Sequence, residues 1–435
     1  YKTLENLCFD ESVRAGLESI SLSTQGGTIV AVDKDFKPLY PAITWLDRRG
    51  EGLLKENKEL CQRNIWFYNK TGWRLDSNFS FMPLYWLKNK KRDLFDKIYK
   101  VLFVNDYLLW HITGNNYQDP SNASITLFYN VKEGKWDKQI LDLLGLDESN
   151  FSEVKRSGEL VGYLKKDICR GIGINRRVKV INGGHDQYCT SIGAGILDES
   201  DILIATGTAW VFFKLINDPV FDNKRLFAIG RNIIEKKYGL IYSIPAAGAS
   251  IRWFALNLLN LSDEKKLFDI ISKEKDKLRD KNNNILFYPY LTGNFGPDFN
   301  IRKKASLLNL ELSHDYLDIL KAIMEGVAFQ LNKIIEVMNE KNITGKRIKM
   351  VGGAAKSEIW PNILADVTGL DMLIPKDFKD DYAAKGAAIL SGTGSGIFSS
   401  LEEGFRKLNN GFTVISPGKN INYYKEKYND FKSSY

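Results

Sequence analysis

Residues 183–195 read GGHDQYCTSIGAG and follow the β-branched apolar residues Val178, Val180 and Ile181. Such a run ending at glycines predicts a buried strand followed by a turn. Asp186 then lies at the end of the strand, where its carboxylate can project into a cleft. A carboxylate in that position can accept the proton of an alcohol during phosphoryl transfer and can also meet a magnesium ion. The alternative is that Asp186 is a helix N-cap, a common role for Asp before a helical run.

Two further strand-to-glycine turns occur downstream. ILIA at 202–205 precedes TGT at 206–208, and IKMV at 348–351 precedes GGAAKS at 352–357. Backbone N–H groups at such turns can bind phosphate, and a glycine pair lets a nucleotide ring lie against the backbone. Each pattern also has a structural alternative, which is an ordinary turn for TGT and a tight strand–helix crossing for the glycine pair. Together with Asp186, the three turns predict a phosphotransferase.

Other glycines and prolines are given structural roles. SGTGSG at 391–396 follows the helical pattern AAKGAAIL and is predicted to be a loop that ends that helix. Gly326, within a predicted helix at 315–338, would cost an isolated helix ~1 kcal/mol, so we expect it to admit another backbone. Pro361 is expected in the first turn of a helix, where it is tolerated. The chain contains no Walker A or GxGxxG pattern, which disfavours the common nucleotide-binding folds.

A candidate polyol-binding segment is AITWLDRRG at 42–50. Trp45, Asp47 and Arg49 stand at alternate positions and share one side of the chain if the segment is extended. Polyols are bound by charged groups that make paired hydrogen bonds and by an aromatic face. The alternative is a cross-strand ion pair beside a buried tryptophan.

Composition and length narrow the class of protein. At 435 residues, two domains are expected, which we place at 1–196 and 197–435. No apolar run approaches the ~20 residues of a membrane span and no signal pattern opens the chain, so we expect a cytoplasmic protein without membrane partners. The net charge of +8 is a small excess of 61 basic over 53 acidic residues without a one-sided stripe, which argues against nucleic-acid binding. A helix that feeds directly into a strand near Ile20 suggests that the chain starts within a domain.

Taken in order, these segments resemble the FGGY family of carbohydrate kinases. The resemblance runs along almost the whole chain, through STQGGTIVAVD, AITWLDRR, NDYLLWHITGNNYQDPSNAS, GGHDQ, ATGTAW, AAGASIRW, YPYLTG, MEGVAFQL and GGAAKSEIWPNILADVTG. It implies an α/β fold of two ribonuclease-H-like domains, of the actin and hexokinase type, with an interdomain cleft. The sugar is then expected mostly on the first domain and ATP mostly on the second.

The resemblance also implies roles for individual residues. Asp186 matches the catalytic base, and ATP and Mg²⁺ are the implied cofactors. The positions that match ATP-binding segments are Thr206, Gly207, Thr208, Gly352, Gly353 and Ser357. The positions that match residues contacting or framing the sugar are Gln25, Trp45, Asp47, Arg49 and Gln187.

Several positions depart from the family pattern. Nothing matches the DxGTT-type hairpin that opens the family and contacts phosphate, so roughly 50 residues are expected to be missing from the start. Asn294-Phe295 replaces the frequent Glu-Arg, which leaves its effect on turnover open. Ala354 and Asn362 replace a frequent glycine and glutamine. Xylulose kinases often carry Gln-Met-His where this chain has Gln-Gly-Gly at 25–27.

The resulting hypothesis is an ATP-dependent carbohydrate kinase that phosphorylates a primary hydroxyl of a ketose, polyol or sugar acid. D-xylulose is the leading candidate for the acceptor, and the alternative is another sugar such as gluconate. Two alternatives stay open: a non-catalytic sugar or nucleotide sensor of the same fold, and an actin- or chaperone-like ATPase. The expected partner is a small-molecule sugar, and a homodimer is expected because many relatives form dimers.

Overall fold

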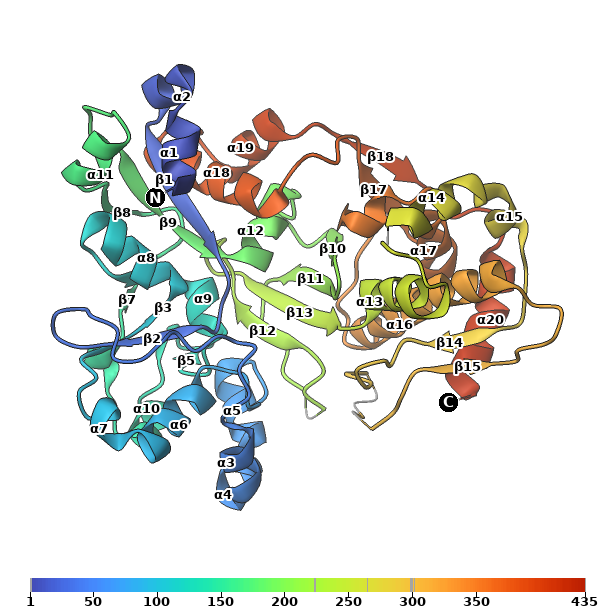
Figure 1. Cartoon of the computed structure of the whole chain (residues 1–435), viewed down its shortest axis with the longest axis horizontal. Helices are drawn as coiled ribbons and strands as arrows, with labels where there is room; N and C mark the ends of the chain where they lie inside the picture. Colours follow the sequence, from blue (N-terminus) through green and yellow to red (C-terminus); the bar gives the residue numbers. More distant parts are fainter. Residues whose placement is uncertain (1, 223, 264, 298–299, 301, 435) are drawn as a thin grey trace. The chain divides into compact units, whose positions relative to one another are not determined.

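The computed structural model describes residues 2–222, 224–263, 265–297, 300 and 302–434 (Figure 1). The chain forms two compact units. Unit 1 contains Tyr1–Leu197, Leu215–Leu240 and Asp381–Asn409, and unit 2 contains Asp198–Lys214, Ile241–Asp380 and Asn410–Tyr435. The chain therefore first leaves unit 1 beside the domain boundary that we place after residue 196, and later returns to it twice.

Unit 1 is rich in short helices. Its helices are α1 (Lys2–Cys8), α2 (Glu11–Gly16), α3 (Glu51–Glu56), α4 (Lys58–Gln62), α5 (Asn64–Thr71), α6 (Phe81–Lys90), α7 (Arg92–Phe95), α8 (Val104–Thr113), α9 (Pro120–Ser124), α10 (Lys138–Leu144), α11 (Lys166–Gly171), α12 (Asp186–Gly193), α18 (Tyr382–Ser395) and α19 (Leu401–Leu408). Its strands are β1 (Ser19–Thr24), β2 (Ile29–Val32), β3 (Lys100–Phe103), β4 (Tyr117–Gln118), β5 (Tyr129–Asn130), β6 (Lys135–Trp136), β7 (Glu153–Val154), β8 (Leu160–Tyr163), β9 (Lys179–His185) and β12 (Ala228–Arg231).

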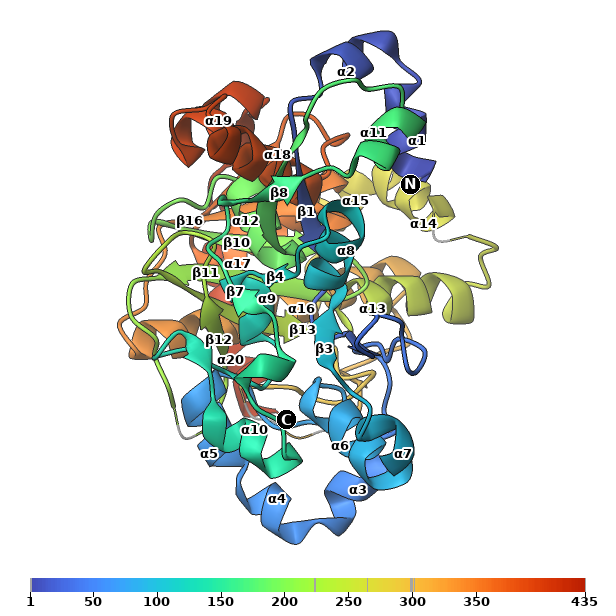
Figure 2. The same ribbon diagram turned by 90° about the vertical axis from the view of Figure 1, so that its left-hand side faces the viewer.

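The sheet that positions Asp186 has the order β1-β9-β8. Strand β9 pairs parallel with β1 and antiparallel with β8, and Val180 and Ile181 within it are fully buried. This is the buried strand that the sequence predicts. The predicted glycine turn is absent, because β9 continues through Gly183 and Gly184, packed against β1, and leads directly into α12. Figures 1 and 2 show α8 on one side of β1 and β9, and α12 and α18 on the other. Because β9 is covered on both faces, its apolar run is continuous rather than alternating.

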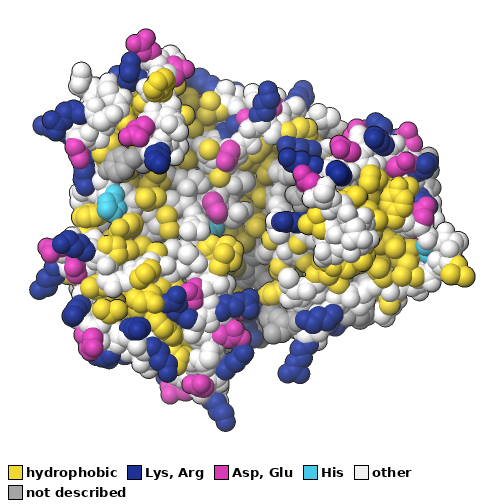
Figure 3. Space-filling view, viewed as in Figure 1, with side chains coloured by type: hydrophobic (Ala, Val, Ile, Leu, Met, Phe, Trp, Pro, Cys, Tyr) yellow, Lys and Arg dark blue, Asp and Glu magenta, His cyan; other side chains and the backbone are white. Residues whose placement is uncertain are grey.

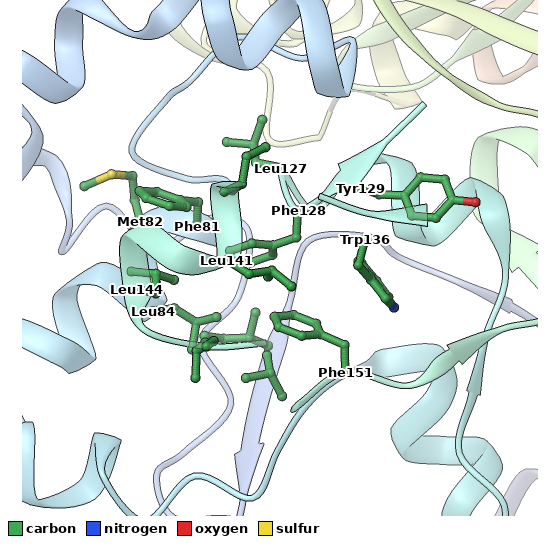
Figure 4. Packing of buried hydrophobic residues seen from close by; sticks show 14 of the residues in the cluster. Phe81, Met82, Leu84, Leu127, Phe128, Tyr129, Trp136, Leu141, Leu144 and Phe151 are labelled. Atoms are coloured by element: carbon green, nitrogen blue, oxygen red, sulfur yellow. The ribbon is translucent and has the colours of Figure 1, made fainter. Parts of the chain in front are cut away.

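A second part of unit 1 packs around aromatic side chains (Figure 4). Phe81 and Met82 of α6 meet Phe128, Leu141 and Phe151 in this cluster, and all five are at most 2% exposed. Phe81 contacts Phe128 at a centroid distance of 5.8 Å, and Phe128 contacts Phe151 at 5.2 Å. Aromatic pairs at these distances stabilise a core beyond the area they bury. The aromatic residues of this cluster are therefore core.

Helix α18 corrects the prediction that SGTGSG at 391–396 is a loop. The helix runs through Ser395, and only Gly396, with a φ of 88°, ends it. A side chain on Gly394 would lie 2.2 Å from the backbone oxygen of Gly158, and one on Gly392 would lie 2.5 Å from the ring of Phe398. These glycines are present because the helix is closely packed. Tertiary contacts outweigh their low helix propensity.

Unit 2 is built on one larger sheet. Its helices are α13 (Ala247–Trp253), α14 (Lys265–Lys273), α15 (Lys275–Asp280), α16 (Tyr316–Glu340), α17 (Trp360–Thr368) and α20 (Ile421–Ser433). Its strands are β10 (Asp201–Thr206), β14 (Leu286–Tyr288), β15 (Ser306–Leu308), β16 (Arg347–Gly352), β17 (Asp371–Pro375) and β18 (Phe412–Ile415), together with most of β11 (Trp210–Ile216) and the second part of β13 (Tyr238–Ile244). The strand order is β13-β11-β10-β16-β17-β18, with β10 parallel to β16.

The helices of unit 2 confirm two predictions. Helix α16 covers the predicted segment, and a side chain on Gly326 would lie 2.0 Å from the backbone oxygen of Phe287 on β14. This glycine therefore admits a neighbouring backbone. Pro361 lies in the first turn of α17, as predicted. Within the described part of the chain, no helix is long and apolar enough to cross a membrane.

Asp106, in the first turn of α8, makes the stability of unit 1 depend on pH. Its carboxylate is fully buried and accepts hydrogen bonds from Ser152 Oγ at 2.7 Å and from the N–H groups of Phe103 and Tyr107. Burial raises the pKa of Asp106 to about 7. The folded protein therefore binds this proton more tightly than the unfolded chain. The stabilising contribution is complete below the ordinary Asp pKa and is lost as pH rises through about 7.

We expect Asp106→Asn to remove this dependence. Between about pH 4 and pH 8, the free energy of unfolding of the parent should fall by roughly 2–4 kcal/mol relative to the variant. Urea unfolding of both proteins across that range measures the difference. A difference that stays constant with pH would show that Asp106 does not titrate there.

Candidate active site

Asp186 is the first residue of α12, directly after β9. The N-cap is His185, whose Nδ1 accepts the N–H of Gln187 at 3.3 Å, so the N-cap alternative for Asp186 is wrong. The Asp186 side chain is 41% exposed, and its Oδ1 lies 3.3 Å from Nδ1 of His185. A negative carboxylate is favoured at a helix N-terminus by the helix dipole. Asp186 thus presents an accessible carboxylate at the end of a rigid strand.

The register of β1 and β9 brings predicted sugar residues beside Asp186. Thr24 pairs with His185, so Gln25 follows β1 where Asp186 follows β9. Trp45 Nε1 donates a hydrogen bond to Gln25 Oε1 at 3.1 Å. Gln25 is exposed and Trp45 is 44% exposed, so both sit on the surface of unit 1. The intervening Gly26 and Gly27 are closely packed, since added side chains would lie 2.7 Å from His185 Cδ2 and 3.3 Å from Trp45 Cβ.

Asp47 and Arg49 do not lie on an extended segment, which was the condition for sharing one side of the chain with Trp45. Residues 44–50 form turns, and Arg49 donates to both carboxylate oxygens of Asp47, at 2.9 and 2.6 Å. This hydrogen bonding holds the pKa of Asp47 below its ordinary value. The Arg49 guanidinium also contacts Tyr40 Oη at 3.1 Å and lies 4.7 Å from the centre of the Trp86 ring. The ion pair of the alternative interpretation is therefore present, although within one segment and beside an exposed Trp45.

A buried polar network supports the start of α12. Asp119 is fully buried at the N-cap of α9 and accepts hydrogen bonds from Ser121 Oγ and Asn122 Nδ2. Ser121 Oγ in turn accepts the N–H of His185 at 2.9 Å, and Asn122 donates to Thr24 Oγ1 at 3.1 Å. The network ties together the ends of β9 and β1. The sequence signal was QDPS, an N-cap Asp before a Pro at N1, but its connection to His185 needs the tertiary structure.

In unit 2, Thr206 joins two of the predicted ATP-binding segments. Its Oγ1 donates to the backbone oxygen of Val351 at 2.7 Å and accepts the N–H of Ala354 at 3.1 Å. Thr206 is buried, whereas Gly207 and Thr208 are exposed. The β10–β11 turn and the β16 turn therefore lie side by side, with Thr206 as the link.

The first turn of α13 supports the TGT turn. The N–H of Ala249 donates to the Thr208 backbone oxygen at 2.9 Å, and the N–H of Gly207 donates to Ala209 oxygen at 3.2 Å. A side chain on Gly248 would lie 2.0 Å from the backbone oxygen of Gly207. The motif AAGASIRW thus positions the turn, a role that its sequence alone did not indicate.

The two interpretations of the glycine pair, close packing and an open surface for a nucleotide, each fit one of its residues. Gly352 has a φ of 95°, and a side chain there would lie 2.2 Å from the backbone oxygen of Thr206. It is therefore required by close packing. Gly353 is exposed, has an ordinary φ, and an added Cβ would meet nothing within 4 Å. Packing does not explain Gly353, which leaves its surface open to a ligand.

The remaining candidates have visible structural roles. Ser357 is 9% exposed, and its Oγ accepts the N–H groups of Ile359 and Trp360 at the start of α17. Its hydroxyl hydrogen can still be donated. Asn294, which departs from the family pattern, is buried, and its Oδ1 accepts the N–H of Gly296 at 3.1 Å. Asn294 therefore shapes its own loop.

Charged side chains away from these turns line a surface hollow on unit 1. Within the described ranges, no group of three or more His, Cys, Asp or Glu side chains is arranged to hold a metal ion. The hollow, lined by Asp33, Asp96, Lys100 and Asn150 among others, contains none of the candidate residues. On the face drawn in Figure 3, basic and acidic side chains are interspersed and form no single large patch.

Two α/β units define a candidate phosphotransferase, because one presents a carboxylate at a strand end and the other presents exposed glycines at strand-end turns. The N-terminal domain of the FGGY family of carbohydrate kinases matches residues 3–193, and its C-terminal domain matches residues 202–394. The chain belongs to this family. It is a carbohydrate kinase, a phosphotransferase with an alcohol group as acceptor.

Similar proteins differ in substrate. The chain is 28% identical to a xylulose kinase from Staphylococcus xylosus, over 92% of this chain and 82% of that protein. It is 25% identical to a gluconokinase from Bacillus subtilis, over 88% and 75% of the two chains. A crystal structure of Plasmodium falciparum glycerol kinase with ADP has a TM-score of 0.86 and 24% identity, covering 99% of this chain and 87% of that chain. These likenesses confirm the predicted α/β fold and leave the sugar open.

Proposed function

We propose that this kinase transfers the γ-phosphoryl group of ATP to a primary hydroxyl of a ketose, with D-xylulose as the leading candidate. The observation that carries the proposal is the Gln25–Trp45 hydrogen bond beside the strand end that bears Asp186. An exposed amide and indole next to a carboxylate suit a small polyhydroxylated ligand. The likeness to the Staphylococcus xylosus xylulose kinase supports the choice of sugar.

In the proposed mechanism, Asp186 orients the acceptor hydroxyl and takes its proton as the hydroxyl oxygen bonds to the γ-phosphorus and the bond from that phosphorus to the ADP oxygen breaks. Its carboxylate is accessible and its backbone is fixed by β9 and by the Ser121 contact to His185. Phosphoryl transfer is accelerated mainly by such positioning and by charge stabilisation. The accessible carboxylate also fits Mg²⁺, which is often held by one or two carboxylates plus substrate phosphates. When bound, Mg²⁺ would neutralise charge on the β- and γ-phosphates.

ATP is proposed to bind on unit 2. The exposed Gly207 and Thr208 would face the phosphates, and the exposed Gly353 would lie against the adenosine. Thr206 and Gly352 hold these two turns together, and Ser357 fixes the start of α17 behind them. We therefore assign contact roles to the exposed residues and positioning roles to the buried ones.

ADP release measured with Mg²⁺-ATP across D-xylulose, L-xylulose, gluconate and glycerol tests the substrate proposal. The highest kcat/KM is expected for D-xylulose. A higher value for gluconate or glycerol would replace D-xylulose while leaving the kinase assignment intact. Sugar binding without ADP release, with ATP bound, would favour the sensor alternative. A cytoplasmic location and a homodimer stay predictions, which fractionation and light scattering would examine.

Gly353→Val is expected to raise KM for ATP by about tenfold without lowering Tm. A side chain there enters open space in the folded protein, so it obstructs only a ligand that lies against the backbone. The matched variant Gly352→Val should instead be strongly destabilised, because of its positive φ and the Thr206 oxygen at 2.2 Å. Steady-state kinetics and thermal unfolding of both variants measure the contrast. An unchanged KM for ATP in Gly353→Val would remove Gly353 from the nucleotide site.

A further inference from the structure

His185, which the sequence patterns did not single out, has one ring nitrogen in use and one unused. Nδ1 accepts the N–H of Gln187 at 3.3 Å and lies 3.3 Å from Asp186 Oδ1. Among the residues that the structure describes, none hydrogen-bonds Nε2. His185 is only 7% exposed, yet Nε2 is not one of the side-chain atoms sealed from solvent. A neutral imidazole whose Nδ1 accepts a hydrogen bond carries its proton on Nε2, so Nε2 is an available donor.

Gln187, the residue after Asp186, carries a complementary group. Its Oε1 is buried and has no hydrogen-bond partner in the described part of the chain. Leaving a buried acceptor unpaired costs ~1–3 kcal/mol, which a bound donor would recover. The residues before and after Asp186 in the chain thus carry a donor and an acceptor without partners among the described residues. Sugar hydroxyl groups both donate and accept hydrogen bonds, so they match this pair.

The position of the His185 ring is set by its neighbours. A side chain on Gly26 would lie 2.7 Å from Cδ2 and 3.1 Å from Nε2 of His185, and 2.4 Å from Cγ2 of Ile125. The ring therefore lies directly against the Gly26 backbone, next to Gln25. The ring also meets Tyr188 in an edge-to-face contact with centroids 5.9 Å apart. The Nε2 atom is consequently held beside the segment that carries Gln25 and Trp45.

We propose that His185 is a substrate-contacting, specificity-determining residue, whose Nε2 hydrogen-bonds a hydroxyl group of the sugar next to the one that is phosphorylated. The inference rests on the proposed function, because it assumes that the sugar binds at the start of α12. It assigns two roles to one ring: Nδ1 caps the helix and Nε2 selects the ligand. Gly26 is required because any larger residue would displace that ring.

Two substitutions of His185 separate these roles. In His185→Asn, the amide oxygen would replace Nδ1 as the helix cap, but the shorter side chain would not reach the position of Nε2. In His185→Gln, the longer side chain can place an amide near that position and loses the cap. His185→Asn should therefore keep Tm and raise the Kd and KM for the sugar about tenfold. His185→Gln should lose about 1 kcal/mol of stability and bind the sugar more tightly than His185→Asn. KM for ATP should not change in either variant.

The experiment uses the full chain, with D-xylulose binding measured calorimetrically and kcat and KM measured by ADP release. His314→Gln is the matched control, because His314 Nδ1 also accepts a backbone N–H, from Glu311 at 2.9 Å, but lies in unit 2. If the parent prefers another sugar of the panel, the D-xylulose proposal fails and His185 is tested with that sugar. Parent-like sugar affinity in His185→Asn, equal losses in both variants, or absence of sugar binding by the parent would overturn the inference.

Discussion

Asp186→Asn is expected to lower kcat by about 10²–10⁴-fold, which is the range that a general base contributes. An amide of the same shape cannot take the proton of the acceptor hydroxyl. The Kd for the sugar should change little, because Gln25 and Trp45 are untouched. Tm should also change little, since the carboxylate is 41% exposed and its polar neighbour in the structure is Nδ1 of His185. The helix dipole contribution that is lost amounts to ~0.3–1 kcal/mol.

Single-turnover ADP formation with saturating sugar and ATP measures this effect on the chemical step. Asp93→Asn is a matched control, because Asp93 is an exposed aspartate in the first turn of another unit 1 helix, α7. It should retain the parent kcat. A rate within about threefold of the parent in Asp186→Asn would remove Asp186 from the role of base.

Gly386→Ala is expected to destabilise unit 1 by about 3 kcal/mol and to reduce kcat as well. Helices α12 and α18 cross at two glycines. A side chain on Gly386 would lie 1.9 Å from the backbone oxygen of Cys189, and one on Gly193 would lie 2.0 Å from that of Tyr382. At each glycine the facing atoms belong to the backbone of the other helix, so the two helices must move apart to admit a methyl group. Since α12 begins at Asp186, the displacement also reaches the carboxylate.

Gly52→Ala is the matched control for this substitution. Gly52 also lies in a helix of unit 1, α3, but an added Cβ meets nothing within 4 Å. Alanine there should raise stability by up to ~1 kcal/mol through helix propensity. Urea unfolding should show changes of opposite sign in the two variants, and kcat should fall only in Gly386→Ala. Equal stability in Gly386→Ala and the parent would mean that the two helices can separate at little cost.

Local patterns in the sequence were sufficient for the elements that carry the site. The runs before GGHDQ, TGT and GGAA are the strands β9, β10 and β16, and Pro361 opens α17 as expected. The strand predictions succeeded because a β-branched apolar run specifies a strand within a few residues, whereas the glycine turn expected at 183–184 is wrong because both glycines belong to β9. The roles of the individual site residues remain proposals.

Predictions that depended on distant contacts were less successful. Residues 391–395 are helical because Gly394 packs against Gly158 and Gly392 packs against Phe398. The helix cap considered for Asp186 belongs to His185, which Ser121 and Gly26 hold in place. Residues 44–50 turn instead of extending, because Arg49 closes onto Asp47, Tyr40 and Trp86. None of these partners can be chosen from spacing alone.

By itself, the sequence determined the strands that end near Asp186, Thr206 and Gly352, the accessible position of Asp186 at one of these ends, and the family whose order of motifs they follow. These properties depend on backbone preferences and burial over short segments. Only the tertiary structure decided which glycine of the 352–353 pair is open, which atom caps α12, and which polar atoms around Asp186 are left without partners. Those properties depend on the packing of segments that are far apart in the chain, where a neighbour within about 2–3 Å of a missing Cβ decides what each residue can do.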